Sequence, residues 1–153
     1  MSEFRCRYGM IHGRFQPFHL EHLRYFRFAW ARSKQLIVGI TNPDPSAVVA
    51  DPLNQHRHLA ENNPFTFVER LIMIQTTIRE AGYPLERVFI VPFHIHHPER
   101  WPHYLPGETT IFVVAYSPWE RGKAERFQQA GYPVVVVDTL EKTISGQHIR
   151  ALI

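Results

Sequence analysis

Short apolar segments alternate with amphipathic ones along most of the chain. Five short runs are apolar almost throughout and rich in Val and Ile, which is typical of strands that are buried on both faces. These predicted strands cover residues 8–12, 35–41, 87–91, 110–116 and 133–138. Other segments have apolar positions three and four residues apart, the spacing of a helix with one buried face. These predicted helices cover residues 19–33, 66–81, 119–130 and 145–153.

Residues with strong preferences for helix ends support these limits. Thr66 is followed by Glu69 three residues later, a capping-box pattern that begins the second helix. Gly82 and Pro84 end that helix, and Gly131 ends the third. The apolar stripe of the first helix consists of His19, Leu23, Phe26 and Trp30, and that of the second consists of Phe67, Leu71, Ile74, Ile78 and Ala81.

The alternation of buried strands and helices predicts one α/β domain that spans residues 1–153. Right-handed crossovers would give a Rossmann-like doubly wound fold, with a five-stranded parallel sheet and helices on both faces. Ligands of such folds bind beyond the carboxyl ends of the strands. Two long loops, residues 42–64 and 92–107, follow strand ends and are expected to reach that edge.

Composition narrows the class of protein. With 44% hydrophobic and 13% aromatic residues, the chain can build a core. It has no apolar run of membrane-spanning length and no signal-peptide pattern, so we expect a cytoplasmic protein without membrane contact. Cys6 is the single cysteine, which excludes an internal disulfide. The net charge of +3 comes from scattered basic residues, a pattern that suits an anionic small molecule better than nucleic acid.

The most informative segment is GRFQPFHLEH, residues 13–22, between the first strand and the first helix. Gly13 allows a sharp turn, and Arg14 supplies a planar, permanently charged fork that suits phosphate. His19 and His22 are three residues apart, on one side of a helix start whose N–H groups attract anions. Taken alone, the two histidines could also be ordinary polar residues at a helix start, or part of a metal site.

The whole segment resembles the GRFQPFHxGH signature of the nucleotidyltransferase superfamily with the HxGH motif. Within that superfamily, the chain is most similar to the short archaeal-type nicotinamide mononucleotide adenylyltransferases. Residues 63–70 resemble the NPFTxxER motif of those enzymes, residues 130–132 also have a counterpart, and residues 144–150 resemble ISGTxIR. The resemblance covers nearly the whole chain.

The resemblance implies transfer of a nucleoside monophosphate, AMP from ATP in the first instance, to a phosphate monoester such as nicotinamide mononucleotide. Pyrophosphate would be released. Residues expected to act on the reacting phosphates are Arg14, His19, His22 and Arg150. Residues expected to bind the nucleotide are Gly13, Phe15, Glu21, Tyr116, Ser145, Gly146 and His148. Residues expected to bind the acceptor are Asn42, Arg70 and Trp101.

Elementary chemistry agrees with such a reaction. The second pKa of a phosphate monoester is about 6, so the acceptor is ionised at neutral pH and needs no general base. Catalysis then consists of positioning and charge neutralisation. Mg²⁺ is the expected cofactor, held mainly by substrate phosphates and water and not by a protein metal site.

The chain departs from the motif at Glu21, where the family has glycine, and at Gln147, where it has threonine. His94, His96 and His97 occupy the loop where archaeal-type enzymes carry an acidic residue, and a metal role for them is a minor alternative. These differences keep two other hypotheses open. One is a CTP-dependent cytidylyltransferase that acts on a phosphonate or another small phosphorylated acceptor, and the other is a non-catalytic nucleotide-binding protein. Assembly into a homo-oligomer is common among such folds, but no sequence feature decides it.

Overall fold

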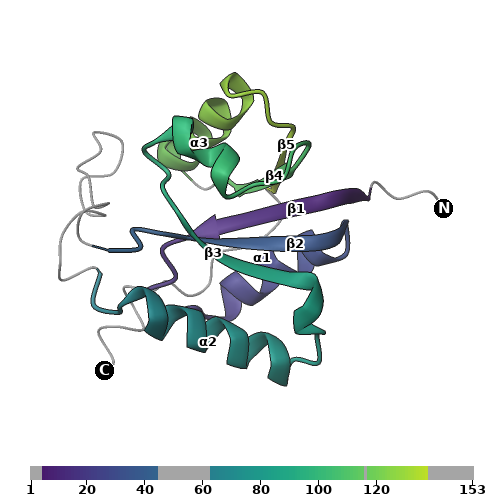
Figure 1. The fold of residues 1–153 in the computed structure, drawn as a ribbon, viewed down its shortest axis with the longest axis vertical. Coiled ribbons are helices and arrows are strands. Elements are labelled where there is room, and N and C mark those ends of the chain that lie inside the picture. The colour runs from purple at the N-terminus through teal and green to yellow at the C-terminus, as the bar shows by residue number, and fades with distance from the viewer. Residues whose placement is uncertain (1–4, 45–62, 116, 138–153) are drawn as a thin grey trace.

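The computed structural model describes residues 5–44, 63–115 and 117–137. In that part of the chain, five parallel strands form one sheet in the order β3-β2-β1-β4-β5 (Figure 1). The strands are β1 (Cys6–Gly13), β2 (Ser33–Thr41), β3 (Val88–Phe93), β4 (Thr110–Val114) and β5 (Val134–Val137). The predicted Rossmann-like fold with a five-stranded parallel sheet is confirmed.

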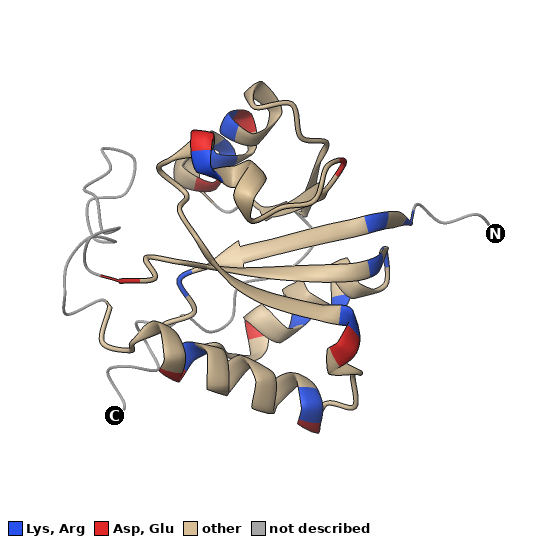
Figure 2. Ribbon diagram, in the orientation of Figure 1, with Lys and Arg blue, Asp and Glu red and all other residues tan. Residues whose placement is uncertain are grey.

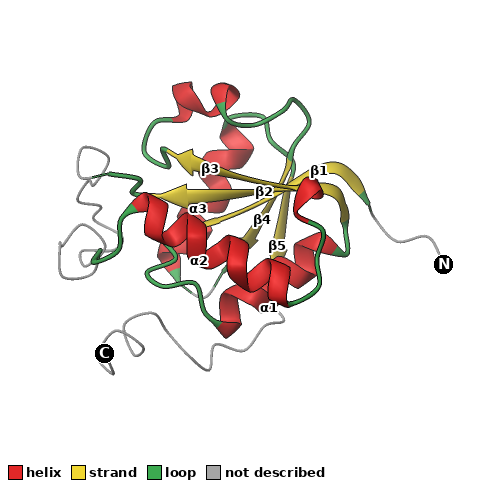
Figure 3. Cartoon of the chain, turned by 60° about the horizontal axis from the view of Figure 1, so that its bottom comes forward, coloured by secondary structure: helices red, strands yellow, loops and turns green. Residues whose placement is uncertain are grey.

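Helices cover both faces of the sheet (Figures 1 and 3). Helices α1 (Leu20–Trp30) and α2 (Phe67–Glu80) lie on one face, and α3 (Pro118–Gln129) lies on the other. Each face has its own hydrophobic cluster, because successive strand residues point to opposite sides. On β1, Ile11 belongs to the cluster with α1 and α2, whereas Met10 belongs to the cluster with α3.

The strand order places the expected ligand site in the middle of the sheet, beyond the carboxyl ends of the strands. From the central strand β1, the chain moves outward to β2 and β3 and then returns to β4 on the other side of β1. A crevice outside the carboxyl ends of β1 and β4 is therefore expected at this reversal. In the register, Gly13 pairs with Ile40, and Ile40 pairs with Pro92, so the first three strands end at the same level.

The predicted boundary between the first helix and the second strand is wrong. The first helix was expected to reach residue 33, but it ends at Trp30, and Ser33 already begins β2. Ser33 pairs with Cys6, whose N–H donates to the Arg32 carbonyl at 2.8 Å. Pairing with β1 therefore overrides the helical pattern at these residues.

The loop predicted over residues 92–107 is not irregular throughout. It contains the 3₁₀ helix η4 (Pro98–His103), and a second 3₁₀ turn, η3 (Leu85–Arg87), precedes β3. The helix predicted over residues 145–153 lies outside the described residues. Among the described helices, none has both the length and the apolar character needed to cross a membrane.

Candidate active site

The turn that follows β1 is shaped by an aromatic side chain that points inward. Phe15 has a left-handed backbone, with φ of 53°, and its ring is only 1% exposed. Its ring meets those of Phe18 and His22 edge to face, at centroid distances of 5.3 and 4.9 Å. Gly13, at the end of β1, packs closely against the same ring. A Cβ added at Gly13 would lie only 3.1 Å from a ring carbon of Phe15. Phe15 thus supports the turn from within.

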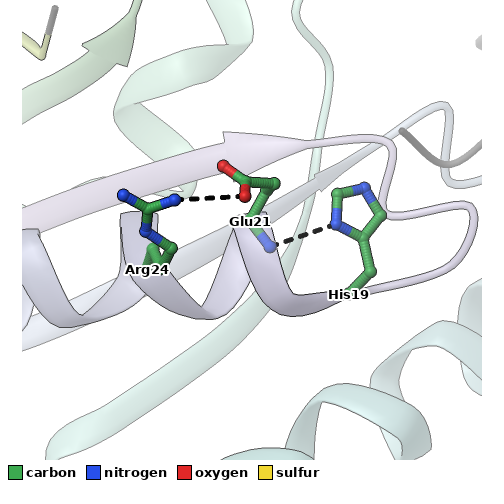
Figure 4. A network of polar contacts seen from close by, with 3 residues as sticks. All are labelled: His19, Glu21 and Arg24. Atoms are coloured by element: carbon green, nitrogen blue, oxygen red, sulfur yellow. Dashed lines mark hydrogen bonds and ion pairs between the residues drawn. The ribbon is translucent and has the colours of Figure 1, made fainter. Parts of the chain in front are cut away.

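The two histidines cap helix α1 reciprocally. The Nδ1 atom of His19, the N-cap residue, accepts a hydrogen bond from the Glu21 N–H at 3.2 Å (Figure 4). The His19 N–H donates to Nδ1 of His22 at 3.1 Å, and the two rings stack with centroids 3.8 Å apart. An Nδ1 atom that accepts carries no proton, so each neutral imidazole carries its proton on Nε2. Both rings are therefore set to donate through Nε2, the polarity that phosphate oxygens require.

Glu21, the residue at the motif glycine, is buried in the first turn of α1 and only 8% exposed. Its Oε1 atom lies 3.2 Å from Nη1 of Arg24, and Figure 4 shows the carboxylate turned toward that guanidinium. The helix N-terminus also favours the negative charge. A carboxylate is thus built into the place where the resemblance expects open space for a nucleotide.

Arg70, expected to bind the acceptor, is 1% exposed and bonded to backbone. Its guanidinium donates to the carbonyls of Thr66, Arg14, Thr41 and Asn42, at 3.1, 2.9, 2.7 and 2.7 Å. Burial lowers the pKa of Arg70 to about 10, so the group remains charged at neutral pH. Arg70 is therefore buried at the carboxyl ends of β1 and β2 and hydrogen-bonded to the backbone of the residues there.

Side-chain amides also connect the segments after β1 and β2 to the residues that precede α2. Gln16 donates to the Phe65 carbonyl at 3.1 Å and accepts from the Phe65 N–H at 2.8 Å. Asn42, another predicted acceptor residue, donates to the Asn63 side chain at 3.2 Å. Segments far apart in sequence thus meet at the carboxyl ends of β1 and β2. Arg14, His19 and Asn42 lie on the connections there, and Glu21 and Arg70 lie in the first turns of α1 and α2.

Trp101, the third predicted acceptor residue, lies in the hydrophobic cluster on the α3 side and has no exposed surface. Its ring stacks on Phe127 with centroids 4.3 Å apart and on Phe93 at 5.7 Å. Its indole N–H donates to the His94 carbonyl at 2.8 Å. The enclosed ring of Trp101 therefore offers no free face on which an acceptor could stack in this structure.

His94 is the residue whose position the sequence left without a role. It follows β3 directly, and its ring lies 5.6 Å from that of Tyr104 and 6.3 Å from that of His97. Burial lowers the pKa of His94, and the nearby Arg100 and His97 lower it further, against the opposing effect of Asp44. The sequence marked it only as one of three loop histidines with a possible metal role, and the structure places it directly after β3.

Other predictions of site chemistry have different outcomes. Lys and Arg are spread over the helices and strand ends in Figure 2, as the scattered sequence positions indicated. Within the described ranges, no three His, Cys, Asp or Glu side chains gather in a way that could hold a metal ion. The remaining predicted site residues lie outside the described residues, namely Tyr116, Ser145, Gly146, His148 and Arg150.

Comparison with known proteins places this site in a family. A phosphonoformate cytidylyltransferase from Streptomyces viridochromogenes is 43% identical over 143 residues, which cover 93% of this chain and 78% of that protein. A nicotinamide-nucleotide adenylyltransferase from Saccharolobus solfataricus is 31% identical over 148 residues, which cover 95% of this chain and 78% of that protein.

A solved structure shares the fold. It is a bifunctional NMN adenylyltransferase/ADP ribose pyrophosphatase from Francisella tularensis, complexed with AMP and a manganese ion, with a TM-score of 0.66 and 21% identity. The match covers 95% of this chain but only 41% of that protein. The model of the cytidylyltransferase-like family matches residues 10–151. The chain therefore belongs to the cytidylyltransferase-like family and is a nucleotidyltransferase.

Proposed function

We propose that this enzyme transfers CMP from CTP to a small phosphonate acceptor and releases pyrophosphate. The main support is the 43% identity with the phosphonoformate cytidylyltransferase over 93% of the chain, against 31% with the Saccharolobus adenylyltransferase. AMP transfer from ATP to nicotinamide mononucleotide, the first expectation from the sequence, becomes the second candidate. The similarity to adenylyltransferases over nearly the same length is the observation in its favour.

The geometry supports phosphate chemistry without a general base. His19 and His22 would donate from Nε2 to oxygens of the triphosphate, and the N-terminus of α1 would add its dipole. Arg14, directly after β1, would neutralise charge between the α-phosphate and the acceptor. An ionised phosphonate oxygen attacks the α-phosphorus, and the bond from that phosphorus to the bridging oxygen of pyrophosphate breaks. These residues position the reactants in line and stabilise the charge that moves to the leaving group.

The donor groups of this edge fit a nucleotide that carries its own metal ion. Imidazole Nε2–H groups, a guanidinium and a helix N-terminus bind phosphate oxygens and not a cation. Mg²⁺ would supply additional neutralisation of the β- and γ-phosphates, coordinated by substrate oxygens and water. The manganese ion described with AMP in the Francisella protein fits this role for a divalent metal.

Glu21 would influence the choice of base by hydrogen-bond polarity. A carboxylate only accepts, so it pairs with a donor such as the exocyclic amino group of cytosine or adenine and is repelled by the O4 carbonyl that uracil carries in place of the cytosine amino group. Its carboxylate is held beside Arg24 in the first turn of α1, where it reduces the room that a glycine would leave. A smaller pyrimidine is the better match for that reduced space.

A pyrophosphate-release assay tests the proposal. CTP, ATP, GTP and UTP are each paired with phosphonoformate, nicotinamide mononucleotide and a sugar phosphate. We expect kcat/KM for CTP with phosphonoformate to exceed every other pair by at least about tenfold, a difference of about 1.4 kcal/mol in transition-state binding. A maximum for ATP with nicotinamide mononucleotide would establish the second candidate instead.

The Glu21→Gly variant in the same assay isolates the role of the carboxylate. We expect the ratio of CTP to ATP turnover to fall by about tenfold or more, because the variant regains room for the larger purine. Loss of the acceptor for the amino group should also lower the ratio of CTP to UTP turnover. Arg24→Ala is the matched control, since it removes the ion-pair partner and keeps the carboxylate. Unchanged ratios of CTP to ATP and of CTP to UTP in Glu21→Gly would show that this residue does not select the base.

A further inference from the structure

One buried guanidinium joins three separate segments at the carboxyl edge of the sheet. Arg70 lies in the first turns of α2 and reaches the carbonyls of Arg14 after β1 and of Thr41 and Asn42 at the end of β2. Its Nε atom donates to the Thr66 carbonyl of its own helix at 3.1 Å. Four of the five N–H donors of an arginine are thus used on backbone oxygens.

The carbonyls that Arg70 binds adjoin unusual backbone. The Arg14 carbonyl precedes Phe15, whose φ is 53°, and the Thr41 carbonyl precedes Asn42, whose φ is 49°. Residues other than glycine adopt this left-handed region at a cost, and they keep it only where the surroundings hold them there. The hydrogen bonds from Arg70 restrain the backbone at both positions.

A second connection fixes the same turn to the start of α2. The Gln16 amide exchanges two hydrogen bonds with the backbone of Phe65, which is near the N-cap Thr66. The turn between β1 and α1 is therefore hydrogen-bonded at two points. The Arg14 carbonyl bonds to Arg70 of α2, and the Gln16 side chain bonds to Phe65 just before that helix. Residues 14–19 lie between the end of β1 and the cap of α1, so this attachment sets where the side chains of Arg14 and His19 begin.

We propose that Arg70 is a positioning residue for nucleotidyl transfer and not an acceptor-binding residue. It holds the β1–α1 turn and the end of β2 in one arrangement, in which Arg14 and His19 meet the triphosphate. The planar fork spans carbonyls on three segments, which the single ammonium group of a lysine cannot do. The inference rests on nucleotidyl transfer by this family and is independent of which base or acceptor the enzyme prefers.

The test compares Arg70→Lys with Arg87→Lys. Arg87 is a matched control, because it also donates to two carbonyls of β2, those of Lys34 at 2.7 Å and Ser33 at 3.4 Å, but at the opposite end of the strand. The binding of CTP without acceptor is measured by calorimetry, kcat and both KM values by pyrophosphate release, and Tm by thermal unfolding. If another triphosphate gives the higher turnover, that triphosphate replaces CTP.

We expect Arg70→Lys to lower kcat by about 10- to 100-fold and to weaken CTP binding, since small displacements of positioned groups have effects of this size. The acceptor KM should change by less than about threefold. Arg87→Lys should lower Tm without changing kcat by more than about twofold. Loss confined to the acceptor KM in Arg70→Lys would overturn the inference, as would unchanged kcat and CTP binding.

Gln16→Ala provides a second variant if Arg70→Lys does not fold. It removes the other attachment of the turn and keeps Arg70, Arg14 and His19 in the chain. We expect the same pattern at smaller size, with lower kcat, weaker CTP binding and an unchanged acceptor KM. Wild-type kcat and CTP binding in folded Gln16→Ala would contradict the idea that α2 holds this turn.

Discussion

Single side chains at the start of α1 have one structural task and one proposed task. His19 and His22 each accept a backbone N–H through Nδ1, which satisfies donors that every helix start leaves without an intrahelical partner. The same bonds set the tautomer and direct the proton to Nε2. A histidine in this place therefore caps the helix, and in the proposed mechanism the same ring donates to a phosphate oxygen. Serine or asparagine would serve only the first task.

His19→Asn separates these tasks. Asparagine keeps a side-chain acceptor for the Glu21 N–H, so we expect a free energy of unfolding close to wild type. It loses the Nε2 donor, and we expect kcat to fall by about 10²- to 10³-fold, as for the loss of other preorganised donors. His19→Ala should lose the same activity and about 1 kcal/mol of stability as well. Denaturant unfolding and pyrophosphate release measure the two effects, and wild-type turnover in His19→Asn would refute the donor role.

Among whole elements, helix α2 shows the best agreement between pattern and structure. The predicted capping box is present: the Thr66 hydroxyl accepts from the Glu69 N–H at 3.2 Å, and the Glu69 carboxylate accepts from the Thr66 N–H at 2.9 Å. A helix start is encoded within four residues, so a sequence can specify it without tertiary information. Helix α1 ends earlier than its pattern indicates, because β1 recruits Ser33 into the sheet.

The capping box makes the stability of α2 depend on pH. Hydrogen bonds from the Thr66 backbone and hydroxyl hold the pKa of Glu69 below its ordinary value of 4.5. A carboxyl with a lowered folded pKa stabilises the fold above its unfolded pKa, and this contribution is lost as the pH falls through the folded value. Denaturant unfolding from pH 7 to pH 3 should therefore show the advantage of wild type over Glu69→Gln shrinking in acid. A difference that stays constant over this pH range for Glu69→Gln would contradict the cap.

At the scale of the whole molecule, the sheet separates two hydrophobic clusters, and the second one is closed by η4. Trp101 from η4 fills the space between Phe93 of β3 and Phe127 of α3. This contact also fixes His94, whose carbonyl accepts the indole N–H. The loop after β3 is thus ordered by the core, and it brings His94 to the level where the strands end.

Trp101→Ala tests this arrangement. Removing a fully buried tryptophan should cost about 3–5 kcal/mol in the free energy of unfolding, measured in denaturant. Trp101→Phe should cost less and should leave the acceptor KM near wild type, because the ring has no exposed surface for a ligand. A large rise in acceptor KM for a stable Trp101→Phe variant would restore the acceptor role that the sequence pattern predicted.

The sequence by itself determined the succession of strands and helices along the chain and the starts of α1 and α2, because periodicity, caps and short motifs are local. It also predicted that residues 13–22 bind phosphate. It also marked Glu21 as a departure. Only the tertiary structure decided where Arg70 and Trp101 lie and what they contact, since their partners come from distant segments. Both residues look polar or ligand-facing in a motif, yet one bonds to the backbone of three segments and the other lies in the core. Burial and long-range hydrogen bonding depend on how the elements pack, and no local pattern contains that information.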